Sequence, residues 1–180
     1  MADFSAIAKW PNVPACYEWL SLDRRGQWRL QGEPVTHRGL IDFMNRQYTH
    51  DANGRWFVQN GPQRVFVDLA CTPWVFRREE GTFVAHTGEA AGTVLALFLD
   101  DEGRVLLETT LGIGLLDDRD LDGFFSACKL ADGRPADEAA LLGLMHGGPG
   151  AAVFHEGLPL RPAAAVDLAK RFAFEPRPRP

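Results

Sequence analysis

Three aspartates around one arginine form the densest group of potential metal ligands in the sequence. Asp117, Asp118 and Asp120 flank Arg119 at the predicted start of a helix. Carboxylates at this density can hold Mg²⁺ or another hard cation, which would activate water for hydrolysis. Acidic side chains at a helix N-terminus also cap free backbone N–H groups and interact favourably with the helix dipole. We favour capping; a metal-assisted hydrolase that uses these aspartates together with His86 is the alternative.

A second candidate group lies at the end of a predicted strand and consists of His86 and Thr87, followed by a glycine. An imidazole, a hydroxyl and free backbone N–H groups near glycine together suit an anion. Further polar groups come from the turn and return strand of a neighbouring predicted hairpin, at Asn60, Gln63 and Arg64. The opposing interpretation is ordinary hairpin chemistry, in which the histidine bonds to the backbone and the other residues only shape the turn.

Two glycine-rich segments resemble known motifs but lack the context that those motifs need. Residues 112–117 begin like a dinucleotide-binding fingerprint, yet an aspartate takes the place of the third glycine and the preceding strand is predicted to be antiparallel. Residues 146–150 are similar to the oxyanion loop of esterases, but the sequence contains no G-x-S-x-G motif. A helix C-terminus explains this second segment better.

The remaining reactive residue types are widely spaced. We interpret three cysteines as buried thiols, because their spacing fits neither a disulfide framework nor a metal site: Cys16, Cys71 and Cys128. Three further histidines are interpreted as ordinary surface or loop residues: His37, His50 and His155. No cofactor, metal ligand set or catalytic residue is therefore assigned, and a non-enzymatic function is favoured.

Residues 22–44 form the unit around which the chain is organised, namely a strand, a turn, a second strand and an amphipathic helix. Gly26 suits the turn because glycine reaches positive φ without a Cβ clash. The same order of elements recurs at 93–130, where a turn closed by Gly103 matches the first turn. A shorter match lies at 157–168. We favour internal duplication for the first match, and convergence on common hairpin and helix patterns for the second.

The predicted elements define an α+β fold made of two related strand-turn-strand-helix halves with antiparallel sheets. A chain of 180 residues is long enough for one domain or for two small, closely packed ones. A short segment rich in small residues, 87–92, is the predicted boundary between the two halves. The N-terminal half then comprises residues 1–90 and the C-terminal half residues 91–180. Residues 1–15 are expected to form an irregular lead-in, and residues 175–180 a frayed tail.

Composition narrows the classes of partner. The chain is 46% hydrophobic and carries a formal charge of −5 without a basic cluster, which disfavours duplex nucleic acid but permits one small anion. No apolar run approaches the roughly 18 residues of a membrane helix. The N-terminus also lacks the basic and apolar regions of a secretion signal. A cytoplasmic location without a membrane partner is expected, and the sequence does not indicate an oligomeric state.

The pattern G-x-W-x-L-x-G-x-P-V at residues 26–35 precedes the first predicted helix, and D-x-x-G-x-W-F-V follows it at 51–58, before Thr72-Pro73. This succession resembles a family of uncharacterised proteobacterial proteins that contain a domain of unknown function. The resemblance implies an α+β protein with an internal duplication and a second half superficially like a pleckstrin-homology fold. It also implies a site for a nucleotide-like ligand between the halves and a role in signalling, with no catalytic residues to carry over.

The function expected from these observations is that of a cytoplasmic protein that binds a small anionic or nucleotide-like molecule, or regulates another protein. The ligand would occupy a cleft between the two halves. The residues expected to line this cleft are Asn60, Gln63, Arg64, His86, Thr87, Asp118 and Arg119. The alternatives are the metal-assisted hydrolase and a protein-interaction domain without a small ligand.

Overall fold

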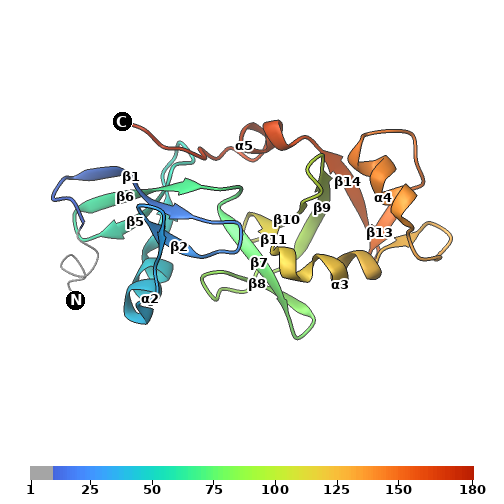
Figure 1. Ribbon diagram of the computed structural model, residues 1–180, viewed down its shortest axis with the longest axis horizontal. Helices are drawn as coiled ribbons and strands as arrows, with labels where there is room; N and C mark the ends of the chain where they lie inside the picture. The colour runs from blue at the N-terminus through green and yellow to red at the C-terminus, as the bar shows by residue number, and fades with distance from the viewer. Residues whose placement is uncertain (1–9) are drawn as a thin grey trace.

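The computed structural model describes residues 10–180 and contains two β-sheets that lie one after the other along the long axis of the molecule (Figure 1). One sheet has six strands and the other has eight, and helices cover them at several places. This arrangement is the α+β fold that the sequence predicts. Among residues 10–180, no helix is long and apolar enough to cross a membrane.

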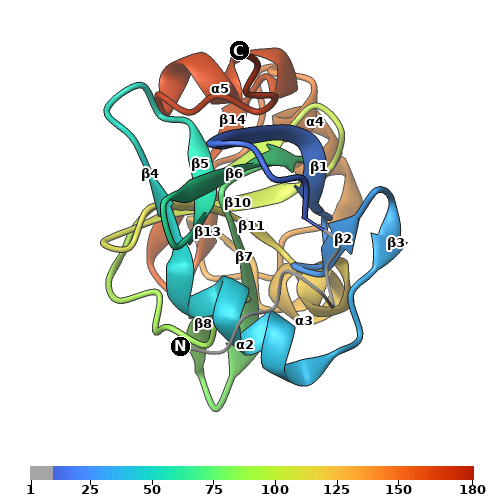
Figure 2. The same cartoon turned by 90° about the vertical axis from the view of Figure 1, so that its left-hand side faces the viewer.

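The first sheet has the strand order β3-β2-β1-β6-β5-β4. Helix α2 (Arg38–Gln47) packs against it through Leu40, Phe43 and Met44, and Figure 2, which faces this half, shows the helix below the strands. The helix begins at His37, whose side chain accepts a hydrogen bond from the Leu40 N–H group. The strands are β1 (Ala15–Leu22), β2 (Trp28–Leu30), β3 (Glu33–Pro34), β4 (Tyr48–His50), β5 (Trp56–Asn60) and β6 (Gln63–Leu69).

The second sheet has the strand order β12-β13-β14-β9-β10-β11-β7-β8. Its two ends approach each other, because Arg78 on β7 forms an ion pair with Glu156, which follows β13. The strands are β7 (Trp74–Glu79), β8 (Thr82–Ala85), β9 (Val94–Asp100), β10 (Val105–Thr109), β11 (Ile113–Leu116), β12 (Lys129–Leu130), β13 (Val153–His155) and β14 (Leu158–Ala163). The helical segments are η1 (Asp118–Asp120), α3 (Leu121–Ser126), α4 (Glu138–Met145), η2 (Ala165–Asp167) and α5 (Leu168–Arg171).

Two details of strand pairing differ from the sequence prediction. The sheets are mixed, because β1–β6, β7–β11 and β9–β14 are parallel pairs. Hydrophobic alternation identifies a strand but not the direction of its partner, which depends on the long connections between them. The chain also changes sheets before Trp74, whereas the predicted boundary lies near residue 90, because β7 pairs with β11 of the second sheet.

The C-terminal tail crosses back onto the first sheet (Figure 1). The Glu175 N–H donates to the Gly54 carbonyl at 2.9 Å, and the Leu69 N–H donates to the Pro176 carbonyl at 2.8 Å. The Arg179 guanidinium completes the attachment by binding the Asp68 carboxylate at 2.9 Å. The prediction of a frayed tail was therefore wrong. Proline lacks an N–H group but keeps its carbonyl, so a proline-rich segment can still accept hydrogen bonds from an adjacent strand.

The two turns that motivated the duplication share one hydrogen-bond pattern. In each, the aspartate at the first position accepts backbone N–H bonds from the residues two and four positions later, starting at Asp23 and at Asp100. The same pattern occurs a third time, starting at Asp51, outside both predicted repeats. Because this turn recurs independently of the repeats, it does not distinguish duplication from shared turn chemistry, and the duplication stays a prediction.

A group of aromatic side chains joins the two sheets into one core and is called the junction cluster below. It consists of Trp28, Tyr48, Trp56, Trp74 and His86, with neighbouring ring centroids 4.7–5.7 Å apart. Tyr48 also donates its hydroxyl to the Pro73 carbonyl at 2.8 Å. Such rings bury a large apolar area and prefer the tilted and edge-on geometries seen here. The cluster therefore holds the two sheets together.

Candidate functional site

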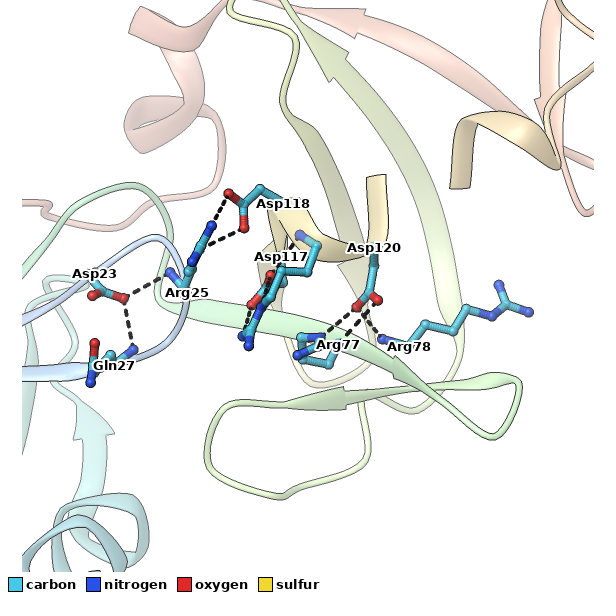
Figure 3. A network of polar contacts seen from close by, with 9 residues as sticks. Asp23, Arg25, Gln27, Arg77, Arg78, Asp117, Asp118 and Asp120 are labelled. Carbon is cyan, nitrogen blue, oxygen red and sulfur yellow. Dashed lines mark hydrogen bonds and ion pairs between the residues drawn. The ribbon is translucent and has the colours of Figure 1, made fainter. Parts of the chain in front are cut away.

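The aspartates at the start of η1 are each held by a different arginine (Figure 3). Asp117 is fully buried and caps η1, because its Oδ1 atom accepts a hydrogen bond from the Arg119 N–H group. Its carboxylate also binds the Arg119 guanidinium, at 2.9 Å from Nε and 2.6 Å from Nη2. Burial raises the pKa of Asp117, but the hydrogen bonds from Arg119 outweigh burial and the net pKa lies below the usual value. Asp117 is thus a structural carboxylate.

Asp118 and Asp120 point toward two different parts of the molecule (Figure 3). Asp118 reaches across to the first half and binds Arg25, at 2.9 Å from Nε and 2.8 Å from Nη2. Asp120 faces β7, where it accepts from the Arg77 Nε at 2.8 Å and from the Arg78 N–H at 2.9 Å. Within residues 10–180, no three His, Cys, Asp or Glu side chains converge as a metal-ligand set. The carboxylates that the hydrolase hypothesis needs are therefore directed at three separate guanidinium groups.

A pocket of about 410 Å³, called the junction pocket below, lies between the halves beside this network. Arg25 comes from the turn between β1 and β2, and Arg119 comes from η1, so each half supplies one guanidinium group. The two side chains are 58% and 49% exposed, so both are open to solvent. The remaining lining residues are Gly26, Gln27, Trp28, Val35 and Ile41. The pocket combines two cationic groups with an apolar wall.

The structure brings only some of the sequence-predicted site residues to the junction. Asp118 and Arg119 lie in the network just described. His86 packs beneath it, because the Cβ position of Gly26 points directly at the His86 Cβ. Thr87 follows in the turn after β8, where its hydroxyl lies 3.5 Å from the Glu89 carboxylate. Neither His86 nor Thr87 is among the residues that line the junction pocket.

The other three predicted residues lie at the opposite end of the first sheet. Gln63 begins β6, and its side-chain amide donates to the Pro11 and Val13 carbonyls. Asn60 contacts the Gln63 side chain at 3.3 Å. Arg64 is exposed and lies over the Phe57 ring, 4.8 Å from its centroid. These residues do not reach the junction, because β6 runs from Gln63 at the far end to Leu69 at the junction.

The His86 ring is enclosed in the junction cluster. The residue as a whole is partly exposed, but its Nε2 atom is inaccessible to solvent and has no hydrogen-bond partner within residues 10–180. Nδ1 accepts a hydrogen bond from the Val75 N–H group at 3.3 Å. Burial lowers the pKa of His86 to about 3, so the ring is neutral at pH 7 and carries its proton on Nε2. A proton that no ligand can reach takes no part in catalysis.

A second pocket, of about 380 Å³, lies beside α3 where the two ends of the second sheet approach, and is called the α3 pocket below. Its wall includes His155, which the sequence analysis assigned to the surface or a loop. That assignment was wrong, since His155 is only 3% exposed and stacks on Phe124 at 4.0 Å between ring centroids. The available signal was the alternation of β13, in which His155 shares the buried face with Val153.

The fold and the sites together define an α+β protein whose two sheets share one core and carry pockets at and beside their junction. The chain belongs to the DUF2944 family, because the model of this family matches residues 2–179. The family is described as "Protein of unknown function (DUF2946)". The family resemblance found in the sequence, to proteins with a domain of unknown function, is thus confirmed. No curated protein matches the sequence.

Two solved structures are similar to this chain. A DUF1285 family protein from Silicibacter pomeroyi DSS-3 has 12% sequence identity and a TM-score of 0.54, over 89% of this chain and 94% of that one. A DUF1285 family protein from Shewanella baltica OS155 has 16% identity and a TM-score of 0.46, over 59% of this chain and 89% of that one. At 12% identity, the similarity to the Silicibacter pomeroyi structure establishes a shared fold and nothing about function.

Proposed function

We propose that this protein is a regulatory module that binds a small anionic, nucleotide-like molecule in the junction pocket. The observation that carries the proposal is the meeting of Arg25 and Arg119, one from each half, over a single pocket between the halves. Opposed guanidinium groups at the mouth of a concave, partly apolar site are the usual means of recognising phosphate or carboxylate groups.

The two arginines keep donors for a ligand although each already binds an aspartate. A guanidinium carries five N–H donors, and Arg25 uses only its Nε and Nη2 atoms in binding Asp118. Asp117 holds Arg119 by its Nε and Nη2 atoms, which orients the side chain before a ligand arrives. The apolar wall formed by Trp28, Val35 and Ile41 suits the flat, less polar part of a nucleotide.

The regulatory part of the proposal rests on how Arg25 connects the halves. Arg25 and Asp118 belong to different halves and form an exposed ion pair across the junction. A phosphate group that binds the remaining Arg25 donors brings a second negative charge beside the Asp118 carboxylate, and the repulsion weakens the ion pair. Ligand binding would thereby change how the turn after β1 is tied to η1.

Titrations with ATP, AMP and inorganic phosphate, followed by thermal unfolding, test this proposal with Arg25→Gln as the variant. Arg24→Gln is a matched control, because Arg24 lies in the same turn, is equally 58% exposed and also pairs with an acid of the other half, Glu102. We expect ATP or AMP to raise the melting temperature of the wild type and the control alike. In Arg25→Gln the apparent Kd should rise roughly ten-fold, the effect of losing one charged hydrogen bond.

Two results would overturn the proposal. One is the absence of any shift with all three probes at millimolar concentration. The other is an unchanged Kd in Arg25→Gln, which would move the ligand away from the junction pocket.

A further inference from the structure

The α3 pocket is built where separate parts of the second half converge. Arg78 and Phe83 come from β7 and β8, while His155 and Glu156 come from β13 and the turn after it. Helix α3 supplies a further part of the wall, including Gly123. Strands at the two ends of the same sheet thus face each other across a cavity of about 380 Å³. Its size matches that of pockets for small organic molecules.

The inner wall of the α3 pocket carries one polar ring, that of His155. The His155 side chain is 97% enclosed and forms part of the pocket wall. One face of the ring stacks on Phe124, with an interplanar angle of 6°. Burial lowers the pKa of His155, so the imidazole is neutral at pH 7 and offers one donor and one acceptor. Because His155 lines the pocket, and its nitrogens are not among the solvent-inaccessible, unpaired atoms of residues 10–180, a ligand in the pocket can bond to this ring.

The rim of the α3 pocket is charge-balanced and includes one pair that is open to a ligand. The Asp120 carboxylate already accepts hydrogen bonds from the Arg77 side chain and the Arg78 N–H group. The Arg119 guanidinium is paired with Asp117. The open pair is Arg78 with Glu156, whose side chains are 32% and 57% exposed. Arg78 also lies over the Phe83 ring, 5.1 Å from its centroid, so the charged rim adjoins an aromatic wall.

We propose that the α3 pocket binds a free aromatic α-amino acid. The ligand carboxylate pairs with Arg78, its ammonium group pairs with Glu156, and its ring enters beside Phe83 and Phe124, within reach of His155. A simple anion would gain Arg78 but face the carboxylate of Glu156, and a simple cation would face the guanidinium instead. A zwitterion offers an opposite charge to both Arg78 and Glu156, and an aromatic side chain can pack against the apolar wall of the pocket. This site shares Arg119 with the junction pocket but uses different ligand-binding side chains, Arg78 and Glu156, so it does not depend on the function proposed for that pocket.

Isothermal titration of the full chain with L-phenylalanine, L-tyrosine and L-tryptophan tests the site directly. Two analogues separate the charged groups: 3-phenylpropionate lacks the ammonium group, and 2-phenylethylamine lacks the carboxylate. We expect at least one of the three amino acids to bind roughly ten-fold more tightly than either analogue, because each analogue leaves one rim charge unpaired. Adenosine is the uncharged aromatic control and should bind more weakly than that amino acid.

Two glycine variants test the location without disturbing the fold. A Cβ at Gly123 meets no atom within 4 Å, so Gly123→Leu places its side chain in open space beside the pocket. Gly143 on α4 is equally open but does not line this pocket, which makes Gly143→Leu the matched control. We expect Gly123→Leu to weaken binding at least ten-fold and Gly143→Leu to leave it unchanged. Glu156→Gln should weaken the binding of the amino acid but not the binding of 3-phenylpropionate.

Several outcomes would overturn the proposal. Equal binding of the amino acid and both analogues would contradict recognition of the zwitterion. Full binding by Gly123→Leu would place the ligand elsewhere. The absence of binding by all three amino acids at millimolar concentration, or tighter binding of adenosine than of any of them, would reject the proposed ligand class.

Discussion

Two histidine rings enclosed by aromatic side chains have opposite surroundings in this protein. His86 lies in the junction cluster, with Trp28, Tyr48 and Trp74 against its ring. His155 is stacked on Phe124, yet it also lines a cavity. Both rings have pKa values lowered by burial. The difference shows that enclosure and a shifted pKa do not identify a functional histidine, because a reacting or binding group must also be reachable.

The backbone around each ring explains the difference. Gly26 lies so close to His86 that an added Cβ would clash with the His86 Cβ, so the β1–β2 turn seals the junction cluster. Gly123 on α3 faces open space and leaves the α3 pocket unfilled. We therefore interpret the junction cluster as scaffold and the α3 pocket as a place for a ligand. Three pairs of substitutions can test this contrast.

The largest expected effect comes from truncating the sealed cluster. Trp74 is 5% exposed and contacts three other rings of the cluster, so Trp74→Ala should lower the free energy of unfolding by about 3–5 kcal/mol. Phe83→Ala in the α3 pocket should cost less, since a ring that borders a cavity has fewer packing partners to lose. Urea unfolding at pH 7 measures both. Equal losses would show that the two regions are equally well packed.

The second-largest effect is a decrease in folding stability at acid pH, which we expect to come mainly from His86. Its pKa is about 3 in the folded chain, against an ordinary value of 6.5, so between these values only the unfolded chain takes up the proton. Stability from this group is therefore fully present above pH 6.5 and is lost as the pH falls toward 3. Between pH 7 and pH 4 the loss amounts to at most about 3 kcal/mol.

The variants His86→Gln and His155→Gln separate the two histidines in urea unfolding at pH 7 and pH 4. His86→Gln should remove most of the acid-induced loss, because glutamine does not titrate but still offers an acceptor to the Val75 N–H group. His155→Gln should change the pH dependence in the same direction and by less, since its ring borders a cavity. A larger effect at His155 would reverse our assignment of the sealed and open regions.

The smallest effects should come from alanine at the two glycines. Gly26 has a φ of +72° and no room for a side chain, so Gly26→Ala should destabilise the fold by about 2 kcal/mol. Gly123 lies inside α3 with open space around it, so Gly123→Ala should stabilise the fold by roughly 0.5–1 kcal/mol. Thermal unfolding of both variants measures the opposite signs. A stabilising Gly26→Ala would show that the turn does not seal the cluster.

Local features of the fold could be predicted from the sequence because they depend on residues close together in the chain. The turn at Asp23 and the helix at Arg38–Gln47 follow from hydrogen bonds and periodicity within a few positions. The cap at Asp117 is equally local, since its partner Arg119 is two residues away. Alternation along β13 also placed His155 on a buried face, although the sequence analysis did not use that signal.

The sequence by itself thus determined the family, the α+β class, the turns and the presence of a capping aspartate within residues 117–120. Only the tertiary structure decided which side chains share a pocket. Arg25 and Asp118 are 93 positions apart, and they meet because the chain changes sheets before Trp74 and β11 then pairs with β7. Such contacts depend on strand order and on packing around the junction cluster, and neither leaves a local pattern in the sequence. For the same reason Asn60, Gln63 and Arg64, although polar and close together in the sequence, lie at the far end of the first sheet.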